Sequence, residues 1–330
     1  MPEPSSKSVS SGPSVVTSRE TVRVFGSASL SNLGPGFDTL GLCIRGLGDV
    51  VEARLTDSGR VEIVDVTGDG GALPRVPSEN TASRAARWVL DRAESDRGLE
   101  LVIKKGIPLG SGVGGSAASA VAGAWAANLL LDRPFSREDL VEAVLTGEAG
   151  ADGARHGDNV LPALFGGLVL VSSSDPNSYR RVRIPSGLHI ALVLPDIEVL
   201  TREAREILPE HVTLRDAVHN ASQVAFLLEA MRAGDWKEAG RLIMTDRLVE
   251  PVRARLVEPY EAIREAALQA EAFGCALSGS GPALFALTDR AEKARAVAEA
   301  MDEASEQAGV RARRFAVEVD LRGVRQIEDS

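Results

Sequence analysis

Hydrophobic and polar positions follow two different periods along the chain from residue 21 onward. Short stretches in which apolar residues alternate with polar ones, or run together, are typical of strands, whereas apolar residues recurring every three or four positions are typical of helices. The first pattern predicts strands at 21–26, 49–55, 60–66, 99–104, 166–172, 189–194, 275–278, 283–288 and 313–319. The second predicts helices at 79–92, 116–131, 136–145, 213–232, 259–273 and 291–308. Helices therefore dominate the second half.

Several of the predicted helices carry signals at their ends. Ser136 with Asp139, and Thr213 with Asp216, have the spacing of a capping pair that satisfies the first amides of a helix. Gly234 is expected to end the helix that Thr213 begins. The stretch at 116–131 is apolar nearly all round, so we expect a buried helix there.

Length and local composition predict how the chain is divided. A chain of 330 residues suggests about two domains. Residues 1–20 are rich in Ser and Pro and have neither apolar periodicity nor the apolar core of a signal peptide, which predicts a disordered leader. A polar run at 172–178 that contains a proline places a boundary near residue 180. We therefore expect an N-terminal domain at 21–180 and a C-terminal domain at 181–330.

Charge and composition exclude several classes of protein. Lys and Arg number 37 against 47 Asp and Glu, which gives a net charge of −10 and argues against a nucleic-acid partner. The longest apolar run, at 121–131, is too short to cross a membrane. With only two cysteines, Cys43 and Cys275, a disulfide framework and a Cys-rich zinc site are excluded. A reducing compartment fits this usage, and we expect a cytoplasmic location.

The most informative motif is a glycine-rich loop at 108–119, which lies between a predicted strand and the buried helix. Successive glycines let backbone amides point into one concavity, and the following helix N-terminus adds partial positive charge, so the loop suits a polyphosphate. A Walker A loop is excluded because no Lys lies between Gly106 and Leu131. A dinucleotide motif is disfavoured because Asp132 ends a helix, where that fold requires a strand.

Two further glycine-rich loops lie elsewhere in the sequence, one before and one after the loop at 108–119. The loop that begins near residue 27 holds Asn32 and Asp38 on a Gly/Pro scaffold just after the first strand, although Asn is also common in ordinary turns. The loop at 277–284 separates two apolar runs, and taken alone it is more typical of a hairpin turn than of a site.

These three loops, in this order, resemble the GHMP kinase family over nearly the whole chain, from Thr21 to about Val319. The segments between the loops strengthen the resemblance, and they are Gly147-Glu148, His156–Val160, Thr201–Arg205 and Glu250–Arg253. The resemblance implies an α+β, two-domain GHMP kinase fold. Its N-terminal domain would be like domain 2 of ribosomal protein S5, and its C-terminal domain would be ferredoxin-like, with the active site between them.

The resemblance also implies an activity. Within the family the segments best match members that use ATP and Mg²⁺ to phosphorylate the side-chain hydroxyl of L-homoserine, a step of threonine biosynthesis. Another small-molecule kinase of the family, such as one acting on mevalonate, is the alternative, because mevalonate also carries a carboxylate. A non-catalytic protein of this fold is expected to have lost Ser116, Glu148 or the arginine pair, and all are present. The resemblance leaves a homodimer open.

The resemblance implies roles for individual residues. Those expected to contact ATP are Asn80, Lys105, Pro108, Leu109, Gly110, Ser111, Gly112, Val113, Gly114, Gly115, Ser116 and Ala117. Ser116 and Glu148 would hold the metal. Lys105 is either an ATP contact or an exposed lysine at the end of a strand. Many family members have Ser-Ser where this chain has Gly115-Ser116, which puts one secondary phosphate contact in doubt.

The amino-acid substrate needs both cations and acceptors. Arg205 and Arg253 are expected to bind its carboxylate, because a guanidinium can bind a carboxylate through two parallel bonds. Acceptors for the ammonium and hydroxyl would be Asn32 and Asp38, with His156 and Thr201 completing the pocket. For Asp158-Asn159 the resemblance implies two alternatives: Asp158 is a base, as in relatives acting on mevalonate, or no dedicated base exists, as in relatives acting on homoserine.

Overall fold

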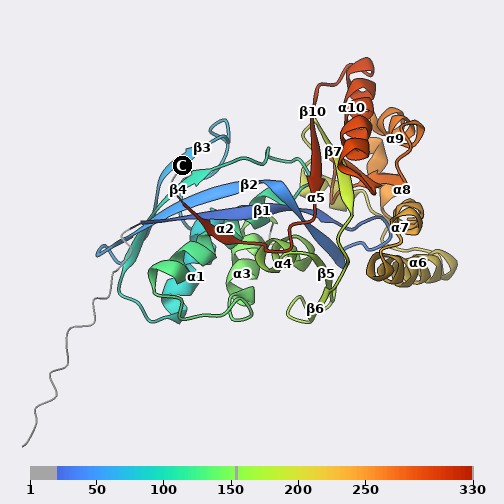
Figure 1. Ribbon diagram of the computed structural model, residues 1–330. Helices are drawn as coiled ribbons and strands as arrows, with labels where there is room; N and C mark the ends of the chain where they lie inside the picture. The colour runs from blue at the N-terminus through green and yellow to red at the C-terminus, as the bar shows by residue number, and fades with distance from the viewer. Residues whose placement is uncertain (1–20, 153–154, 329–330) are drawn as a thin grey trace, which may run out of the picture.

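The structure is a computed structural model and describes residues 21–152 and 155–328, so the leader expected at 1–20 lies outside the described residues. Two lobes are built around two separate sheets (Figure 1). The strands of the first lobe are β1 (Thr21–Ser31), β2 (Leu40–Thr56), β3 (Val61–Thr67), β4 (Gly98–Lys104), β5 (Leu168–Val171), β6 (Tyr179–Val182) and β11 (Arg325–Ile327). Its helices are α1 (Thr81–Arg92), α2 (Gly115–Leu130), α3 (Val141–Asp152) and α4 (Gly157–Phe165).

The first lobe is a seven-stranded sheet covered on one face by α1 to α4 (Figure 1). The main path of the sheet is β11-β1-β2-β4-β3, and β5 extends it from the other end of β2. Helix α2 is buried over most of its length, as its apolar composition predicts. It packs so closely on β1 that a Cβ at Gly26 would lie 2.1 Å from the carbonyl oxygen of Ala118. Glycine is therefore required where the helix crosses this strand.

The second lobe is a four-stranded antiparallel sheet with helices on both faces. Its strands are β7 (His189–Pro195), β8 (Gly274–Leu277), β9 (Leu284–Thr288) and β10 (Ala312–Glu318). Its helices are α5 (Thr201–Glu206), α6 (Leu214–Ala233), α7 (Trp236–Ile243), α8 (Glu250–Arg253), the short 3₁₀ helix η1 (Ala254–Leu256), α9 (Tyr260–Gln269) and α10 (Ala291–Gln307). The order β10-β7-β9-β8 is that of a ferredoxin-like fold, as expected.

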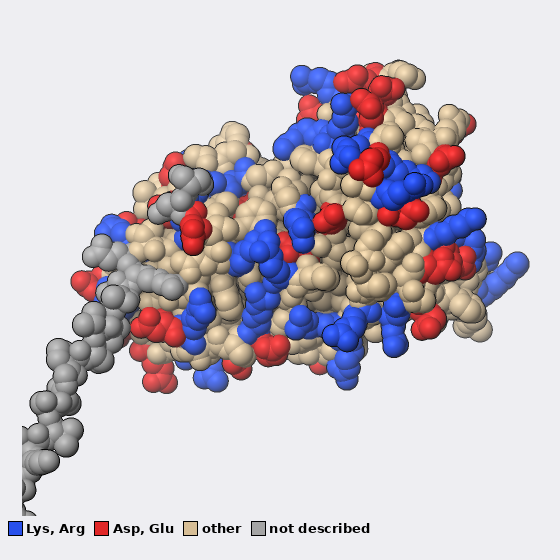
Figure 2. Space-filling model, in the orientation of Figure 1, with Lys and Arg blue, Asp and Glu red and all other residues tan. Residues whose placement is uncertain are grey.

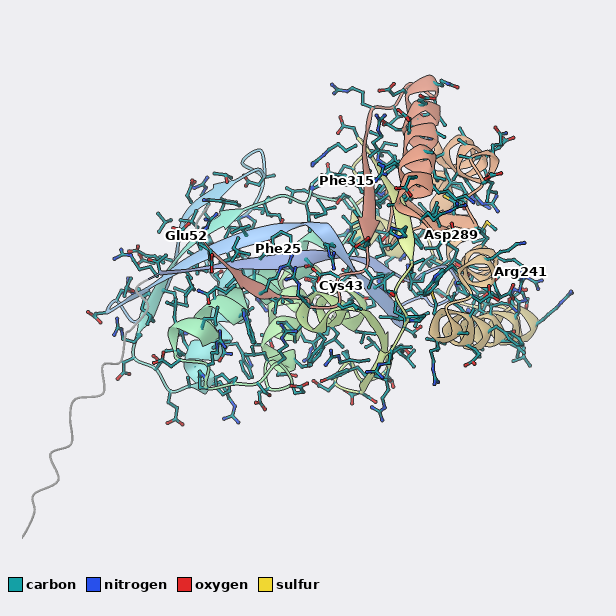
Figure 3. All side chains as sticks on the ribbon, viewed as in Figure 1. Phe25, Cys43, Glu52, Arg241, Asp289 and Phe315 are labelled. Atoms are coloured by element: carbon teal, nitrogen blue, oxygen red, sulfur yellow. The ribbon has the colours of Figure 1, made fainter. Side chains whose placement is uncertain are left out.

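Strand alternation divides the core of the second lobe into two layers. Along β7, Leu192 packs in the cluster shared with α6 and α7, whereas Val193 packs in the cluster shared with α9 and α10. This follows because successive side chains of a strand point to opposite faces. In Figure 3, Phe25 and Glu52 mark the first lobe and Phe315, on β10, marks the second.

The end of the chain returns from the second lobe to the first, where β11 pairs with β1 (Figure 1). The return is held by Asp320, whose side chain is fully buried. Its carboxylate accepts bonds from Ser27 at 3.0 Å and Arg325 at 2.7 Å. Strand β6 also spans the boundary expected at residue 180, so the first lobe is completed by segments on both sides of it.

Four predicted elements differ clearly from the structure. The strand predicted at 49–55 already begins at Leu40, where the backbone pairs with β1 and β5. Strand β1 continues through the expected loop at 27–31, because Ala28 and Leu30 are buried and the backbone pairs with β2. The helix expected at 136–145 begins only at Val141. Ser136 and Asp139 do bond to each other, but the next amides bond three residues back and form turns. Helix α9 ends at Gln269, before the predicted end at 273. By contrast, α6 begins after Thr213 and ends at Gly234 as predicted.

Side chains of both charges are interspersed over the face shown in Figure 2, so the acidic excess does not gather in one patch there. Among residues 21–152 and 155–328, no helix combines the length and the apolar character that a membrane crossing requires.

Candidate active site

A pocket of about 720 Å³ lies between the two lobes. Its walls come from all three glycine-rich loops and from α5. Of the residues predicted from the sequence, it brings together Asn32, Asp38, Asn80, Lys105, Pro108, Leu109, Gly110, Ser111, Gly112, Gly114, Gly115, Ser116, Glu148, His156, Asp158, Asn159, Thr201, Arg205 and Arg253. Val113 and Ala117 do not line it, because their side chains are fully buried in the core.

One wall of the pocket is the segment 106–114, here called the phosphate loop, which leads into α2. Gly110, Gly112 and Gly114 have φ values of +62°, +76° and +71°, which residues other than glycine rarely adopt. These turns bring the loop to the N-terminus of α2, where free amides and the helix dipole favour an anion.

The third glycine-rich loop is a brace for the phosphate loop rather than a hairpin turn alone. Ser278 donates from Oγ to the carbonyl oxygen of Gly112 at 2.8 Å, and the amide of Ala283 donates to Ser111 O at 3.2 Å. A Cβ at Gly112 would lie 2.6 Å from the carbonyl oxygens of Ser278 and Gly281, so the close contact also requires glycine. The two lobes therefore meet at this point of the pocket.

Ser116 and Glu148 form a pair of oxygen donors beside the phosphate loop. Ser116 Oγ, in the first turn of α2, donates to Glu148 Oε1 on α3 at 2.8 Å. Thr81 Oγ1 donates to the carbonyl oxygen of Ser116 at 3.2 Å and joins this turn to α1. Within the part of the chain that the structure describes, no cluster of three or more His, Cys, Asp or Glu side chains could hold a metal by itself.

Asn80 and Lys105 are both engaged by the protein. Asn80 caps α1, where its Oδ1 accepts the amide of Ala82 at 3.0 Å. Lys105 was expected to be either an ATP contact or an exposed lysine at the end of a strand. The second alternative is wrong, because the Lys105 side chain is only 2% exposed. Its ammonium bonds to Asp49, to the carbonyl oxygen of Gly115 and to Ser119 Oγ.

The opposite end of the pocket carries four charged or polar side chains around an aromatic ring. Arg205 donates two bonds to the carboxylate of Asp38, at 3.1 and 3.0 Å, and its Nη2 lies 3.3 Å from His156 Nδ1. Arg205 and Arg253 both stack on Phe37, with distances of 5.4 and 5.0 Å from the guanidinium carbon to the ring centroid. The ring holds two guanidinium groups side by side.

Arg253 is buried and fixed by backbone carbonyls. Its Nε donates to Ala204 O at 3.0 Å and its Nη1 to Gly279 O at 2.8 Å. Burial, together with the charge of Arg205, lowers the pKa of Arg253 to about 10, so the group remains a cation at neutral pH. Behind it, the buried carboxylate of Glu250 accepts from Tyr260 at 2.6 Å and from the amide of Leu277 at 3.1 Å.

Asn32 and Asp38 lie on a tight turn after β1, with φ values of +70° and +55°. Asn32 Nδ2 donates to Gly279 O at 3.1 Å, and Asn32 Oδ1 accepts the amide of Asp38 at 3.2 Å. The turn is thereby fixed to the third glycine loop, and it holds the Asp38 carboxylate in front of Arg205.

Asp158 and Asn159 begin helix α4 between the two ends of the pocket. Asp158 is buried, and desolvation, reinforced by the nearby charge of Asp38, raises its pKa to about 6. Asn159 is held by two serines of β1: its Oδ1 accepts from Ser29 at 2.9 Å, and its Nδ2 donates to Ser31 Oγ at 3.2 Å.

Several residues that shape the site were not predicted from the sequence. Phe37 adjoins Asp38 in a loop that was already singled out, so an aromatic next to that carboxylate was an available signal. Ser119 is the last residue of the glycine-rich segment at 108–119, so its position was also an available signal. Asp49 carried none, because it lies 56 residues from Lys105 and meets it only in the fold.

Comparison with known proteins agrees with this geometry. The family described as "GHMP kinases N terminal domain" matches residues 80–167, and "GHMP kinases C terminal" matches residues 227–307. The chain belongs to the GHMP kinase family. The two-domain α+β GHMP kinase fold that was expected is confirmed.

Similar proteins narrow the position of this GHMP kinase within the family. A homoserine kinase of Chlorobium phaeobacteroides is 40% identical over 86% of this chain and 92% of its own length. One from Xylella fastidiosa is 42% identical over 87% of this chain and 88% of its own length. The crystal structure of homoserine kinase from Cytophaga hutchinsonii superposes with a TM-score of 0.92 at 36% identity, covering 96% of this chain and all of that one.

Proposed function

We propose that this GHMP kinase is an ATP-dependent transferase that phosphorylates the side-chain hydroxyl of L-homoserine to O-phospho-L-homoserine, in threonine biosynthesis. The observation that carries the proposal is one pocket with two unlike ends. A glycine loop and a helix N-terminus suit a triphosphate at one end, and Asp38 with two arginines suits a zwitterion at the other. The similarity to homoserine kinases at about 40% identity supports this choice of substrate.

At the nucleotide end, the amides of the phosphate loop and the first turn of α2 are placed to bind phosphate oxygens. Ser116 and Glu148 fit a Mg²⁺ ion, because both offer oxygen atoms at adjacent positions and Mg²⁺ takes its remaining ligands from phosphates and water. The ion, when bound, neutralises charge on the phosphates. Ser116 and Glu148 would hold it, and Thr81 and α1 keep that turn of α2 in position.

At the acceptor end, the substrate ammonium would lie against Asp38 and its carboxylate against Arg205 and Arg253. Arg253 donates from Nε and Nη1 to backbone carbonyls. Among residues 21–152 and 155–328, Nη2 has no such partner, so it can bind a ligand. Asn32, His156 and Thr201, all on the pocket wall, would complete the contacts to the ammonium and hydroxyl.

We further propose that transfer needs no dedicated base. Phosphoryl transfer is mainly positioning and charge stabilisation, and in a loose transition state the alcohol can pass its proton late, to the phosphate itself. Asp158, with its pKa near 6, would instead act electrostatically beside the ammonium, and Asn159 would orient the reacting groups.

A coupled assay of ADP release tests the choice of acceptor. Purified protein with ATP and Mg²⁺ is given L-homoserine, mevalonate, shikimate or galactose at equal concentrations. We expect turnover with L-homoserine to exceed that with each of the others by at least about a hundredfold, because only this acceptor offers both an ammonium to Asp38 and a carboxylate to the two arginines. Faster turnover of mevalonate would replace this proposal with the alternative, which the similarity to homoserine kinases does not favour.

We also propose a cytoplasmic location. Cys43 and Cys275 are both free and buried, and burial raises the pKa of both thiols, which suits residues that are kept reduced.

A further inference from the structure

Asp49, a buried carboxylate near the middle of β2, joins the two ends of the phosphate loop. Its Oδ1 accepts the amides of Gly106 at 3.0 Å and Ile107 at 3.2 Å, where the loop begins. Its Oδ2 accepts the hydroxyl of Ser119 at 2.7 Å, in the second turn of α2, just beyond the end of the loop. The Asp49 side chain has no exposed surface. One carboxylate thus ties together segments that are more than ten residues apart.

Lys105 completes this junction from β4. Its ammonium donates to Asp49 Oδ2, to the carbonyl oxygen of Gly115 at 2.8 Å and to Ser119 Oγ at 2.9 Å. An ammonium has three N–H donors, and these three partners match that number. The positive charge of Lys105 is therefore directed toward a buried anion and toward the first turns of α2, although the residue also borders the pocket.

We propose that Asp49 is a positioning residue for the nucleotide site, and that Lys105 acts through the same junction rather than as a direct ligand of the phosphates. The inference rests on the ATP site of the proposed function. A loop with three glycines in the left-handed region is costly to order, and a junction that fixes both of its ends orders the amides before ATP arrives. Preordered donors stabilise phosphate charge without reorganising during the reaction.

The substitution Asp49→Asn tests whether Lys105 acts through the junction or binds the phosphates directly, because the two alternatives predict opposite changes in the Kd for ATP. It keeps an oxygen for the amides of Gly106 and Ile107, but it places an NH₂ group against the Lys105 ammonium and the Ser119 hydroxyl. If the junction positions the loop, the Kd for ATP rises, and we expect a rise of about tenfold or more. If Lys105 is instead a phosphate ligand that Asp49 restrains, release of the ammonium strengthens ATP binding.

The double substitution Asp49→Asn/Lys105→Met provides a second criterion. With the ammonium gone, the introduced amide can donate to Ser119 Oγ, so part of the junction is restored. We expect the double variant to bind ATP more tightly than Asp49→Asn alone, because removing one partner of a buried pair is worse than removing both. A double variant that binds ATP no better than Asp49→Asn would contradict the junction.

The measurement is isothermal titration of MgATP into the full chain without any acceptor, followed by steady-state KM values for ATP and L-homoserine. The matched control is Arg54→Met/Glu100→Gln, an exposed pair that joins the same two strands and should leave the Kd for ATP unchanged. The KM for L-homoserine should also stay near the wild-type value in Asp49→Asn, because the acceptor end does not contact the junction.

Tighter or unchanged ATP binding by Asp49→Asn also overturns the proposal, and so does an equal loss of ATP affinity in the control pair. If Asp49→Asn does not yield folded protein, Ser119→Ala replaces it. A weaker affinity for ATP then supports the junction and an unchanged affinity overturns it. Because ATP binding is measured without acceptor, wild-type protein that binds ATP yet fails to phosphorylate L-homoserine would refute the substrate and leave this test intact.

Discussion

Arg205 and Asp38 face each other from different lobes and form a bidentate ion pair, with N–O distances of 3.0 and 3.1 Å. Arg205 lies on α5 of the second lobe, and Asp38 lies on the turn between β1 and β2 of the first. Both side chains are partly exposed, at 39% and 24%, so the pair alone adds little stability. When a zwitterion binds, its ammonium can pair with Asp38 and its carboxylate with Arg205, in place of the ion pair between the two side chains. The site should therefore select substrates that carry both charges.

Asp38→Asn should remove the preference for an amino group in the substrate. We expect kcat/KM for L-homoserine to fall by roughly thirtyfold or more, because a charge-assisted bond to the ammonium is lost. 4-Hydroxybutyrate, which lacks the ammonium, should lose far less. Steady-state kinetics with both acceptors gives the ratio. Asp65→Asn, at an exposed ion pair on β3, is the control and should leave the ratio unchanged. Equal losses for both acceptors would show that Asp38 does not contact the ammonium.

Arg253→Leu should raise the KM for L-homoserine steeply, by about a hundredfold, while the KM for ATP stays near its original value. The reason is that Arg253 is buried at the acceptor end and stacks on Phe37 beside Arg205. Arg253→Lys should not restore binding, because an ammonium lacks the planar fork. Thermal unfolding must accompany the kinetics, since Arg253 also bonds to Ala204 O and Gly279 O. A rise in the KM for ATP alone would place Arg253 outside the acceptor site.

Glu148→Gln and Ser116→Ala should each lower kcat and raise the Mg²⁺ concentration that gives half-maximal activity. Both residues supply an oxygen at the same point, 2.8 Å apart, and loss of either weakens a site that has few protein ligands. We expect the larger effect, about a hundredfold in kcat, from Glu148→Gln, because it also removes the negative charge. Titration of activity with Mg²⁺ at saturating ATP measures both values. An unchanged Mg²⁺ requirement in both variants would move the metal elsewhere.

The sequence predicts the phosphate loop and the pocket well because their signals are local. Three glycines within five residues require an unusual backbone, and the structure gives all three positive φ values. Helix α6 was also well predicted, since Thr213 and Gly234 determine its ends within a few residues. Local chemistry of this kind needs no knowledge of the rest of the fold.

Long-range partners were beyond the reach of such reasoning. Lys105 has the sequence context of an exposed strand end, and only the pairing of β2 with β4 brings Asp49 beside it and buries both. Strand β11 has three residues and forms only because β1 offers an edge for it. The role of the third glycine loop as a brace depends on its contact with Gly112 across the two lobes. Each of these features is set by tertiary contacts between distant segments.

Asp158→Asn should leave measurable turnover with L-homoserine. A reaction without a dedicated base loses only the electrostatic contribution of the carboxylate, so we expect kcat to fall by about tenfold rather than to vanish. Activity is measured from pH 6 to 9 for wild type and variant with both substrates saturating. Complete loss of kcat, with ATP and L-homoserine still bound, would restore Asp158 as the base.

The same substitution should change how stability depends on pH. Burial and the charge of Asp38 raise the pKa of Asp158 from its ordinary 3.8 to about 6. Between those values the folded chain holds more protons than the unfolded chain, so the free energy of unfolding falls as pH rises. Relative to its ionised form, the neutral carboxyl of Asp158 stabilises the folded chain below about pH 4, and this stabilisation is lost by about pH 6. Glu250, whose pKa burial raises to about 7, acts in the same direction.

Asp158→Asn removes the cost of a buried charge, so its stability relative to wild type should improve from pH 4 to pH 7, by up to roughly 3 kcal/mol. Urea unfolding without ligands at the two pH values measures the change. Glu250→Gln should give a change of the same sign, because its carboxylate is also buried, whereas Asp65→Asn, at an exposed carboxylate, should give none. If the difference between wild type and Asp158→Asn is the same at pH 4 and pH 7, then folding does not raise the pKa of Asp158 and the pocket is more hydrated than its burial indicates.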